Sequence, residues 1–117
     1  MKVINPAKIE AKEIKDNPLF IGKVTAKFFI GPDDAGDLGM GLITFAPGAR
    51  NKLHTHTAGQ ILYATGGEGI VATEKEEISM TPGMAVYIPS GEKHWHGATK
   101  KSSFSHLSIA PPHKTDF

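Results

Sequence analysis

The chain has 117 residues, enough for one domain with a substantial core but not for two. Its 13 Lys and Arg and 12 Asp and Glu leave a net charge of +1 with no basic stripe, so we expect no nucleic-acid partner. The absence of Cys excludes disulfide frameworks, thiol nucleophiles and thiolate metal sites. No apolar run is long enough to span a membrane and no signal-peptide pattern opens the chain, so we expect a cytoplasmic protein without membrane contacts.

Residues 1–23 are predicted to form an N-terminal arm, followed by a single domain over 24–117. Asn5 and Pro6 suit the start of a helix over 7–14, because Asn caps helices well and Pro fits the first helical position. The isoleucines of this segment do not follow a helical stripe, so an extended arm is the alternative.

From residue 24 onward, short β-rich runs alternate with turn signals. The 13 Gly and 8 Pro exceed the average share of these residues, which favours many tight turns. Two of the runs are predicted to form a hairpin around Lys75 and Glu76. The predicted strands cover 24–30, 40–46, 52–56, 60–65, 70–74, 77–80, 84–89, 93–97 and 103–110. Short strands at such spacing, with no convincing long helix, predict an all-β fold consisting of a single small β-barrel or jelly roll.

Five of the six histidines lie between positions 54 and 106. Residues two apart on a strand share a face, so His54 points the same way as His56, and His94 the same way as His96. Two such pairs on neighbouring strands of a barrel would converge on one interior volume. Because imidazole is a common metal ligand, this predicts a metal site, the alternative being that one pair lies on the surface.

Two stretches carry the resemblance to a known family. Residues 48–67 read G-x5-H-x-H-x3-Q-x6-G, and residues 83–98 read G-x5-P-x-G-x2-H-x3-A. They resemble the two sequence motifs of the cupin superfamily, whose fold is a small jelly-roll barrel. The resemblance implies a divalent transition metal held by four residues: His54, His56, Gln60 and His94.

The motifs depart from the common cupin pattern at two positions. Gln60 stands where most cupins have Glu, and Ala98 where they have Asn. Glutamine can bind a metal through its carbonyl oxygen, but a neutral ligand set leaves the full charge on the metal. This favours Lewis-acid chemistry over oxygen chemistry. The alternative is a metal-free pocket lined by an amide.

One subgroup of cupins is more similar still, over residues 54–60, 92–98 and 105–109. This subgroup is associated with carboxymuconolactone decarboxylase and includes bacterial hydroxynitrile lyases that depend on manganese. The resemblance implies manganese, although the ligand set also suits Fe, Ni, Zn, Cu and Co. It implies His106 as the first candidate for the catalytic base and His96 as the second. The alternative for His106 is a buried histidine that only makes a structural hydrogen bond.

The resulting hypothesis is a metal-dependent enzyme that acts on a small hydroxy or carbonyl compound, as a hydroxynitrile lyase or a related lyase or isomerase would. A quercetinase-like dioxygenase and a non-catalytic cupin that binds a small molecule are the alternatives. Strand alternation predicts a compact, partly hydrophobic substrate, because the interior face would carry Leu62, Ala64, Phe104 and either Met40 and Leu42 or Gly41 and Ile43.

Apolar residues are also predicted on the outside of the barrel. Such a surface predicts a homodimer, with ordinary packing between sheets as the alternative. The residues concerned are Trp95, Ile61, Tyr63, Leu107 and Ile109. His113 follows two prolines and is predicted to lie in a C-terminal tail outside the site.

Overall fold

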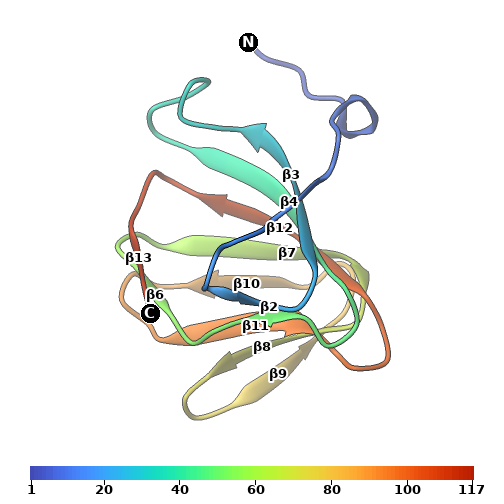
Figure 1. Cartoon of the computed structure of the whole chain (residues 1–117). Helices are drawn as coiled ribbons and strands as arrows, with labels where there is room; N and C mark the ends of the chain where they lie inside the picture. Colours follow the sequence, from blue (N-terminus) through green and yellow to red (C-terminus); the bar gives the residue numbers. More distant parts are fainter.

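The computed structural model describes all 117 residues and consists almost entirely of antiparallel strands in two facing sheets (Figure 1). In spatial order, the six-stranded sheet contains β1 (Lys12–Glu13), β3 (Val24–Ile30), β4 (Gly39–Phe45), β12 (Phe104–Ala110), β7 (Gln60–Gly67) and β10 (Ala85–Ile88). The five-stranded sheet contains β2 (Phe20–Ile21), β5 (Arg50–Asn51), β11 (His94–Ala98), β8 (Gly69–Thr73) and β9 (Glu77–Met80). A separate pair joins β6 (Thr55–His56) to β13 (Thr115–Asp116). The prediction of an all-β jelly-roll barrel is confirmed.

The N-terminal segment is extended apart from one turn of 3₁₀ helix, η1 (Pro6–Lys8). Asn5 caps this turn, since its side-chain oxygen accepts a hydrogen bond from the backbone N–H of Ala7 at 3.1 Å. Of the two alternatives for this segment, the extended arm forms and the helix over 7–14 does not, because the chain lays β1 against β3 and then β2 against β5. The domain boundary at residue 23 stays a prediction.

None of the helical segments in the structure reaches the length and hydrophobicity that a membrane span requires.

The core lies between the two sheets and follows the alternation of the strands. Leu62, Ala64 and Phe104 are fully buried, as predicted for the interior face. Of the two possibilities for β4, the structure shows that Gly41 and Ile43 face inward, since Ile43 packs against the core cluster. Burying a side chain the size of Leu or Phe contributes roughly 1.5–3 kcal/mol, so this layer is a main source of stability.

Two predicted strand boundaries are wrong in informative ways. The run predicted as one strand over 52–56 contains only the bridge at His54 and the short strand β6, because β5 ends at Asn51 and a bend follows at Leu53. The predicted turn at Gly67 is the end of β7, where a positive φ of 73° and the nearby Ser103 carbonyl leave no room for a side chain. The bend at Leu53 affects the site, because it interrupts the alternation of the strand and so changes which side chains point into the barrel.

The predicted apolar surface is divided between the two sheets. Ile61 and Tyr63 lie on the outer face of β7, with Ile109 and Leu107 opposite them on β12. Trp95 does not belong to this surface, because it lies on β11 in the other sheet, with the Arg50 guanidinium 3.9 Å above its ring. The predicted homodimer stays a prediction.

Candidate metal centre

A single β-bridge brings together two histidines that are far apart in the sequence. The backbone N–H of His54 donates to the carbonyl of His94 at 2.9 Å, and the N–H of His94 donates back at 3.0 Å. Residues directly opposite each other in an antiparallel pair carry their side chains on the same face. Both imidazoles therefore point into the barrel, with ring centroids 4.2 Å apart.

His56 adds a third ring from the same face, two residues further along the chain. Its centroid lies 4.7 Å from that of His54 and 5.2 Å from that of His94. All three residues are buried, and one ring nitrogen from each can be chosen so that the three lie within 4.8 Å of one another. Three buried imidazoles in this arrangement are able to hold a metal ion.

Backbone carbonyls determine which nitrogen of two of these rings carries the hydrogen. The Nδ1 of His54 lies 2.6 Å from the carbonyl oxygen of Lys52, and the Nδ1 of His94 lies 2.8 Å from that of Glu92. A carbonyl can only accept, so each Nδ1 carries the hydrogen and donates it. The Nε2 atoms then carry the lone pairs, and that of His94 is buried without any hydrogen-bond partner.

The third ring is held from the C-terminal end of the chain. The Nδ1 of His56 lies 2.9 Å from the side-chain oxygen of Thr115, on the strand that pairs with β6. The Nε2 of His56 is buried and has no partner, like that of His94. A hydrogen bond on the far nitrogen of a metal-binding imidazole orients the ring and increases its basicity.

Gln60 reaches the cluster from the facing sheet, at the start of β7. Its Nε2 donates to the Oγ of Ser108 at 2.8 Å, while its Oε1 is buried without a partner. A buried unsatisfied acceptor costs about 1–3 kcal/mol, and this site gathers two of them, the Oε1 of Gln60 and the Nε2 of His94, beside the unpartnered Nε2 of His56. One cation bound among these three atoms would give each of them a partner, so the residues present fit a divalent transition metal.

Burial keeps the histidines of this cluster neutral. It lowers the pKa of His54 to about 4 and that of His56 to about 3, with repulsion from neighbouring imidazoles as a further cause. The pKa of His94 is also lowered, again chiefly by burial. Neutral imidazole is the form that binds metals, so near neutral pH protons would not compete for these ligand atoms.

A second group of buried polar residues lies beside the first. The Nε2 of His106 is 3.0 Å from the Nδ1 of His96, and the Nε2 of His96 is 3.1 Å from the Nδ2 of Asn51. All three residues are buried, and the ring of His106 also packs against Phe45 and Phe104. The structure therefore brings together the two residues predicted as bases, with an asparagine as their neighbour.

His96 forms the link between the two groups. Its ring centroid lies 5.8 Å from that of His54 and 5.9 Å from that of His94, to which it is nearly parallel. Burial lowers the pKa of His106 to about 4, and burial together with neighbouring imidazoles holds the pKa of His96 well below 6.5. Both rings are therefore neutral near pH 7, next to the cluster that is able to hold a metal.

Comparison with known proteins identifies the family. A model of the cupin domain matches residues 41–110, more than half of the chain. The chain is a cupin.

The matched region contains the histidine cluster, Gln60 and the His96–His106 pair. The chain is 43% identical over 82 residues to the (R)-mandelonitrile lyase of Granulicella tundricola. The aligned part spans 69% of this chain and 62% of that relative, less than two thirds of its length.

Solved structures agree on the fold over nearly the whole chain. A cupin-like protein of Thermotoga maritima is 26% identical and superposes with a TM-score of 0.78, covering 97% of this chain and 87% of that one. The polyketide cyclase RemF of Streptomyces resistomycificus is 23% identical with a TM-score of 0.84, covering 100% and 86%. At that level of identity the likeness to RemF shows the fold alone.

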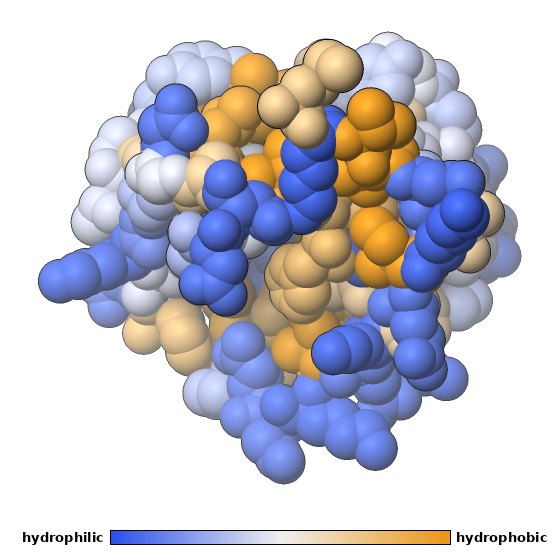
Figure 2. Space-filling model, turned by 90° about the horizontal axis from the view of Figure 1, so that it is seen from above, coloured by the Kyte–Doolittle hydropathy of each residue, from blue (hydrophilic) through white to orange (hydrophobic).

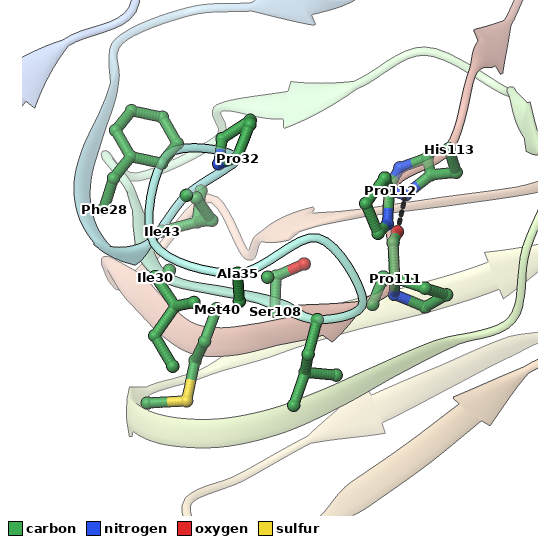
Figure 3. A pocket seen from close by; sticks show the side chains of 15 residues that line it. Phe28, Ile30, Pro32, Ala35, Met40, Ile43, Ser108, Pro111, Pro112 and His113 are labelled. Atoms are coloured by element: carbon green, nitrogen blue, oxygen red, sulfur yellow. Dashed lines mark hydrogen bonds between the residues drawn. The ribbon is translucent and has the colours of Figure 1, made fainter. Parts of the chain in front are cut away.

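An apolar pocket of about 360 Å³ opens beside the histidine cluster of the cupin. It lies between the 31–38 loop, the first residues of β4, the last residues of β12 and the prolines that follow β12. Seen from the end of the molecule that carries this loop, apolar side chains gather in the centre and hydrophilic ones surround them (Figure 2). Phe28, Pro32 and Ile43 are among the apolar residues of its wall (Figure 3).

Only two of the lining residues have polar side chains, Ser108 and His113 (Figure 3). Each also contacts the cluster. Ser108 accepts the hydrogen bond from Gln60, and the ring of His113 packs edge-on against that of His56 with centroids 4.6 Å apart. The pocket therefore borders the site on the side of Gln60 and His56.

Three residues of the site were not predicted from the sequence. Asn51 lies three positions before His54, an odd spacing that places two residues on opposite faces of a continuous strand. The bend at Leu53 turns both inward. Thr115 and His113 lie in what was predicted to be a tail, and no local pattern indicates that β13 returns to β6. The roles predicted for His54, His56, Gln60 and His94 as ligands, and for His96 and His106 as bases, stay predictions.

Proposed function

We propose that this cupin is a metal-dependent lyase that cleaves a cyanohydrin into a carbonyl compound and hydrogen cyanide. The observation that carries the proposal is the adjacency of two buried sets of side chains. The first set consists of neutral metal-ligand atoms that have no hydrogen-bond partner, and the second is the neutral imidazole pair of His96 and His106. The similarity to an (R)-mandelonitrile lyase at 43% identity supports the choice of substrate class.

Four residues would hold the metal, namely His54, His56, Gln60 and His94. When bound, the metal would act as a Lewis acid toward the substrate oxygen. All four ligands are neutral, so the site would not reduce the charge of the cation, which favours polarisation of an oxygen over stabilisation of an oxidised metal. Manganese is the metal that the resemblance to hydroxynitrile lyases implies.

The His96–His106 pair would supply the base. In the proposed reaction the substrate hydroxyl loses its proton to an imidazole of the pair, and the carbon–oxygen double bond forms as the carbon–carbon bond to the nitrile breaks. Cyanide leaves with the electron pair of that bond and receives the proton as hydrogen cyanide, so the base returns to its neutral form. A base must be unprotonated at the start, and the lowered pKa values of both rings ensure this at pH 7.

The pocket would select the substrate. Its volume of about 360 Å³ and apolar wall suit a compact hydrophobic body such as a phenyl ring. The Oγ of Ser108 accepts from Gln60, so its own hydroxyl hydrogen is free to donate to a substrate oxygen. The Nδ1 of His113 is bound to the carbonyl of Pro111 at 2.8 Å, which leaves its Nε2 as an acceptor at the pocket wall.

The test combines metal analysis with an assay that excludes oxygen. Protein purified without added metal is analysed for its metal content, and its cleavage of mandelonitrile is then followed by the absorbance of benzaldehyde under anaerobic conditions. We expect about one metal per chain and turnover without oxygen. A matched control is Thr65→Val, which removes an exposed hydroxyl whose hydrogen-bond partner is Ser105 and not a residue of the site. Fully loaded protein that releases no benzaldehyde, or that requires oxygen, would refute the proposal.

A further inference from the structure

The buried pair of histidines belongs to a longer hydrogen-bonded chain that ends on backbone groups at both sides. At one end the backbone N–H of His96 donates to the Oδ1 of Asn51 at 2.8 Å. At the other end the Nδ1 of His106 lies 3.2 Å from the carbonyl oxygen of Leu107. A backbone N–H can only donate and a carbonyl can only accept, so these two ends determine the direction of every bond between them.

The amide of Asn51 is therefore oriented by the backbone. Since its Oδ1 accepts from the N–H of His96, the atom that faces the Nε2 of His96 is the Nδ2, a donor. The Nε2 of His96 must then be an acceptor, which puts the hydrogen of the neutral ring on Nδ1. That hydrogen is donated to the Nε2 of His106, whose own hydrogen lies on Nδ1 and meets the Leu107 carbonyl.

We propose that Asn51 is a positioning residue that fixes His96 as a hydrogen-bond donor and leaves the Nε2 of His106 as the basic nitrogen of the pair. The Nε2 of His96 is closed to an incoming proton, because the Asn51 amide occupies it and cannot turn without losing its bond to the backbone. The lone pair on the Nε2 of His106 faces the His96 ring and accepts the hydrogen on its Nδ1. Asn51 sets this order from the side of His96, and the longer contact to the Leu107 carbonyl, at 3.2 Å, agrees with it from the side of His106.

The tautomers can be observed directly, without any enzymatic reaction. Long-range ¹H–¹⁵N correlation spectra of the full chain loaded with diamagnetic zinc, recorded at pH 7, distinguish a protonated imidazole nitrogen from an unprotonated one. We expect Nδ1 to be the protonated nitrogen in both His96 and His106. Protonation of His96 on Nε2, or rapid averaging between its two tautomers, would overturn the proposal. The wild-type spectrum alone decides this, even if a variant fails to fold.

A variant then tests whether Asn51 is the cause. Asn51→Leu removes the amide and should convert the single tautomer of His96 into a mixture. Thr99→Val is the control, because it likewise removes a polar group that is shielded from solvent, but the Thr99 hydroxyl makes no hydrogen bond to either ring. Both variants should retain the metal. An unchanged His96 tautomer in Asn51→Leu would show that the order comes from elsewhere.

The kinetic consequence rests on the proposed lyase function. Asn51→Leu should lower kcat for mandelonitrile by about 10–100-fold, as outer residues of such sites do, with little change in KM. Thr99→Val should leave both parameters as in the wild type. If the wild type shows no lyase activity, the proposed function fails while the spectra still decide the role of Asn51. If it is active and Asn51→Leu retains full kcat, the assignment of Asn51 is wrong although the function stands.

Discussion

Two groups of buried histidines lie side by side in this cupin, and they differ in how completely their nitrogens are hydrogen-bonded. In the first group, His54, His56 and His94, each Nδ1 has a partner, but the Nε2 atoms of His56 and His94 have none. In the second group, His96 and His106, every ring nitrogen has a partner within the protein. The residue type and the degree of burial are alike in the two groups.

The difference separates a binding role from a proton-handling role. A buried acceptor without a hydrogen-bond partner lowers the stability of the folded state, so the first group is arranged to bind a species that the chain itself does not provide. In the second group every ring nitrogen is hydrogen-bonded within the protein, and these bonds stabilise the two rings in their neutral form. We therefore expect changes to the first group to affect the metal and changes to the second to affect turnover and pH dependence.

The largest effect should come from removing a member of the first group. His54→Ala takes away one of three converging imidazoles and should abolish metal binding, as measured by elemental analysis after gel filtration. His106→Phe serves as the control, because it removes an imidazole from the second group and should leave the metal in place. Stoichiometric metal in His54→Ala would contradict the assignment of the cluster.

The next largest effect should come from the second group. His106→Phe keeps an aromatic ring beside Phe45 and Phe104 but removes the proposed base, so turnover of mandelonitrile should fall by about 10²–10⁴-fold. The rate is measured at saturating substrate and normalised to metal content. A rate within a factor of two of the wild type would show that His106 has only a structural part.

Stability should depend on pH because the second group is buried in its neutral form. The pKa of His106 is about 4 in the folded protein against 6.5 for a free side chain, so the unfolded state binds more protons between these values. The free energy of unfolding is thus unaffected by this residue above pH 6.5 and falls as the pH is lowered toward 4. Between pH 7 and pH 5 the loss from His106 is about 2 kcal/mol.

Urea unfolding of the metal-free protein at these two pH values measures the effect. His106→Phe should lose about 2 kcal/mol less than the wild type over the same interval, since it lacks the group that titrates. Identical losses in the two proteins would mean that His106 is already able to take up a proton in the folded state.

The smallest effect should come from the outer partner of a ring in the first group. Thr115→Val removes the hydrogen-bond partner of the Nδ1 of His56 and should weaken metal binding by about tenfold, as measured by competition with a chromogenic chelator. Thr57→Val is a matched control. The Thr57 hydroxyl accepts a hydrogen bond from the backbone N–H of Lys114, in the same C-terminal segment as Thr115, and not from a ring. Equal weakening in both variants would place the effect in the segment and not in the bond to His56.

Much of the fold follows from local patterns in the chain. Turn residues and period-two alternation were sufficient to predict β3 and β9 at their observed bounds and to predict that Leu62, Ala64 and Phe104 face inward. The same alternation predicted that His54 and His56 share a face, because side-chain direction on a strand is a local property. Local patterns left a helix over 7–14 and an extended arm as alternatives, and pairing with β3 decided for the extended arm despite a favourable cap at Asn5.

The sequence by itself determined which chemical groups are present. The chain has no thiolate, four neutral candidate metal ligands at cupin spacing, and two further histidines on strands. Only the tertiary structure decided how those groups are connected. Asn51 meets His96 across 45 positions, and Thr115 meets His56 across 59. Hydrogen bonds between side chains so distant in sequence depend on sheet order, on the bend at Leu53 and on the return of β13, none of which leaves a local pattern. These contacts distinguish the histidines whose Nε2 atoms are left without a partner from the two histidines that hydrogen-bond to each other.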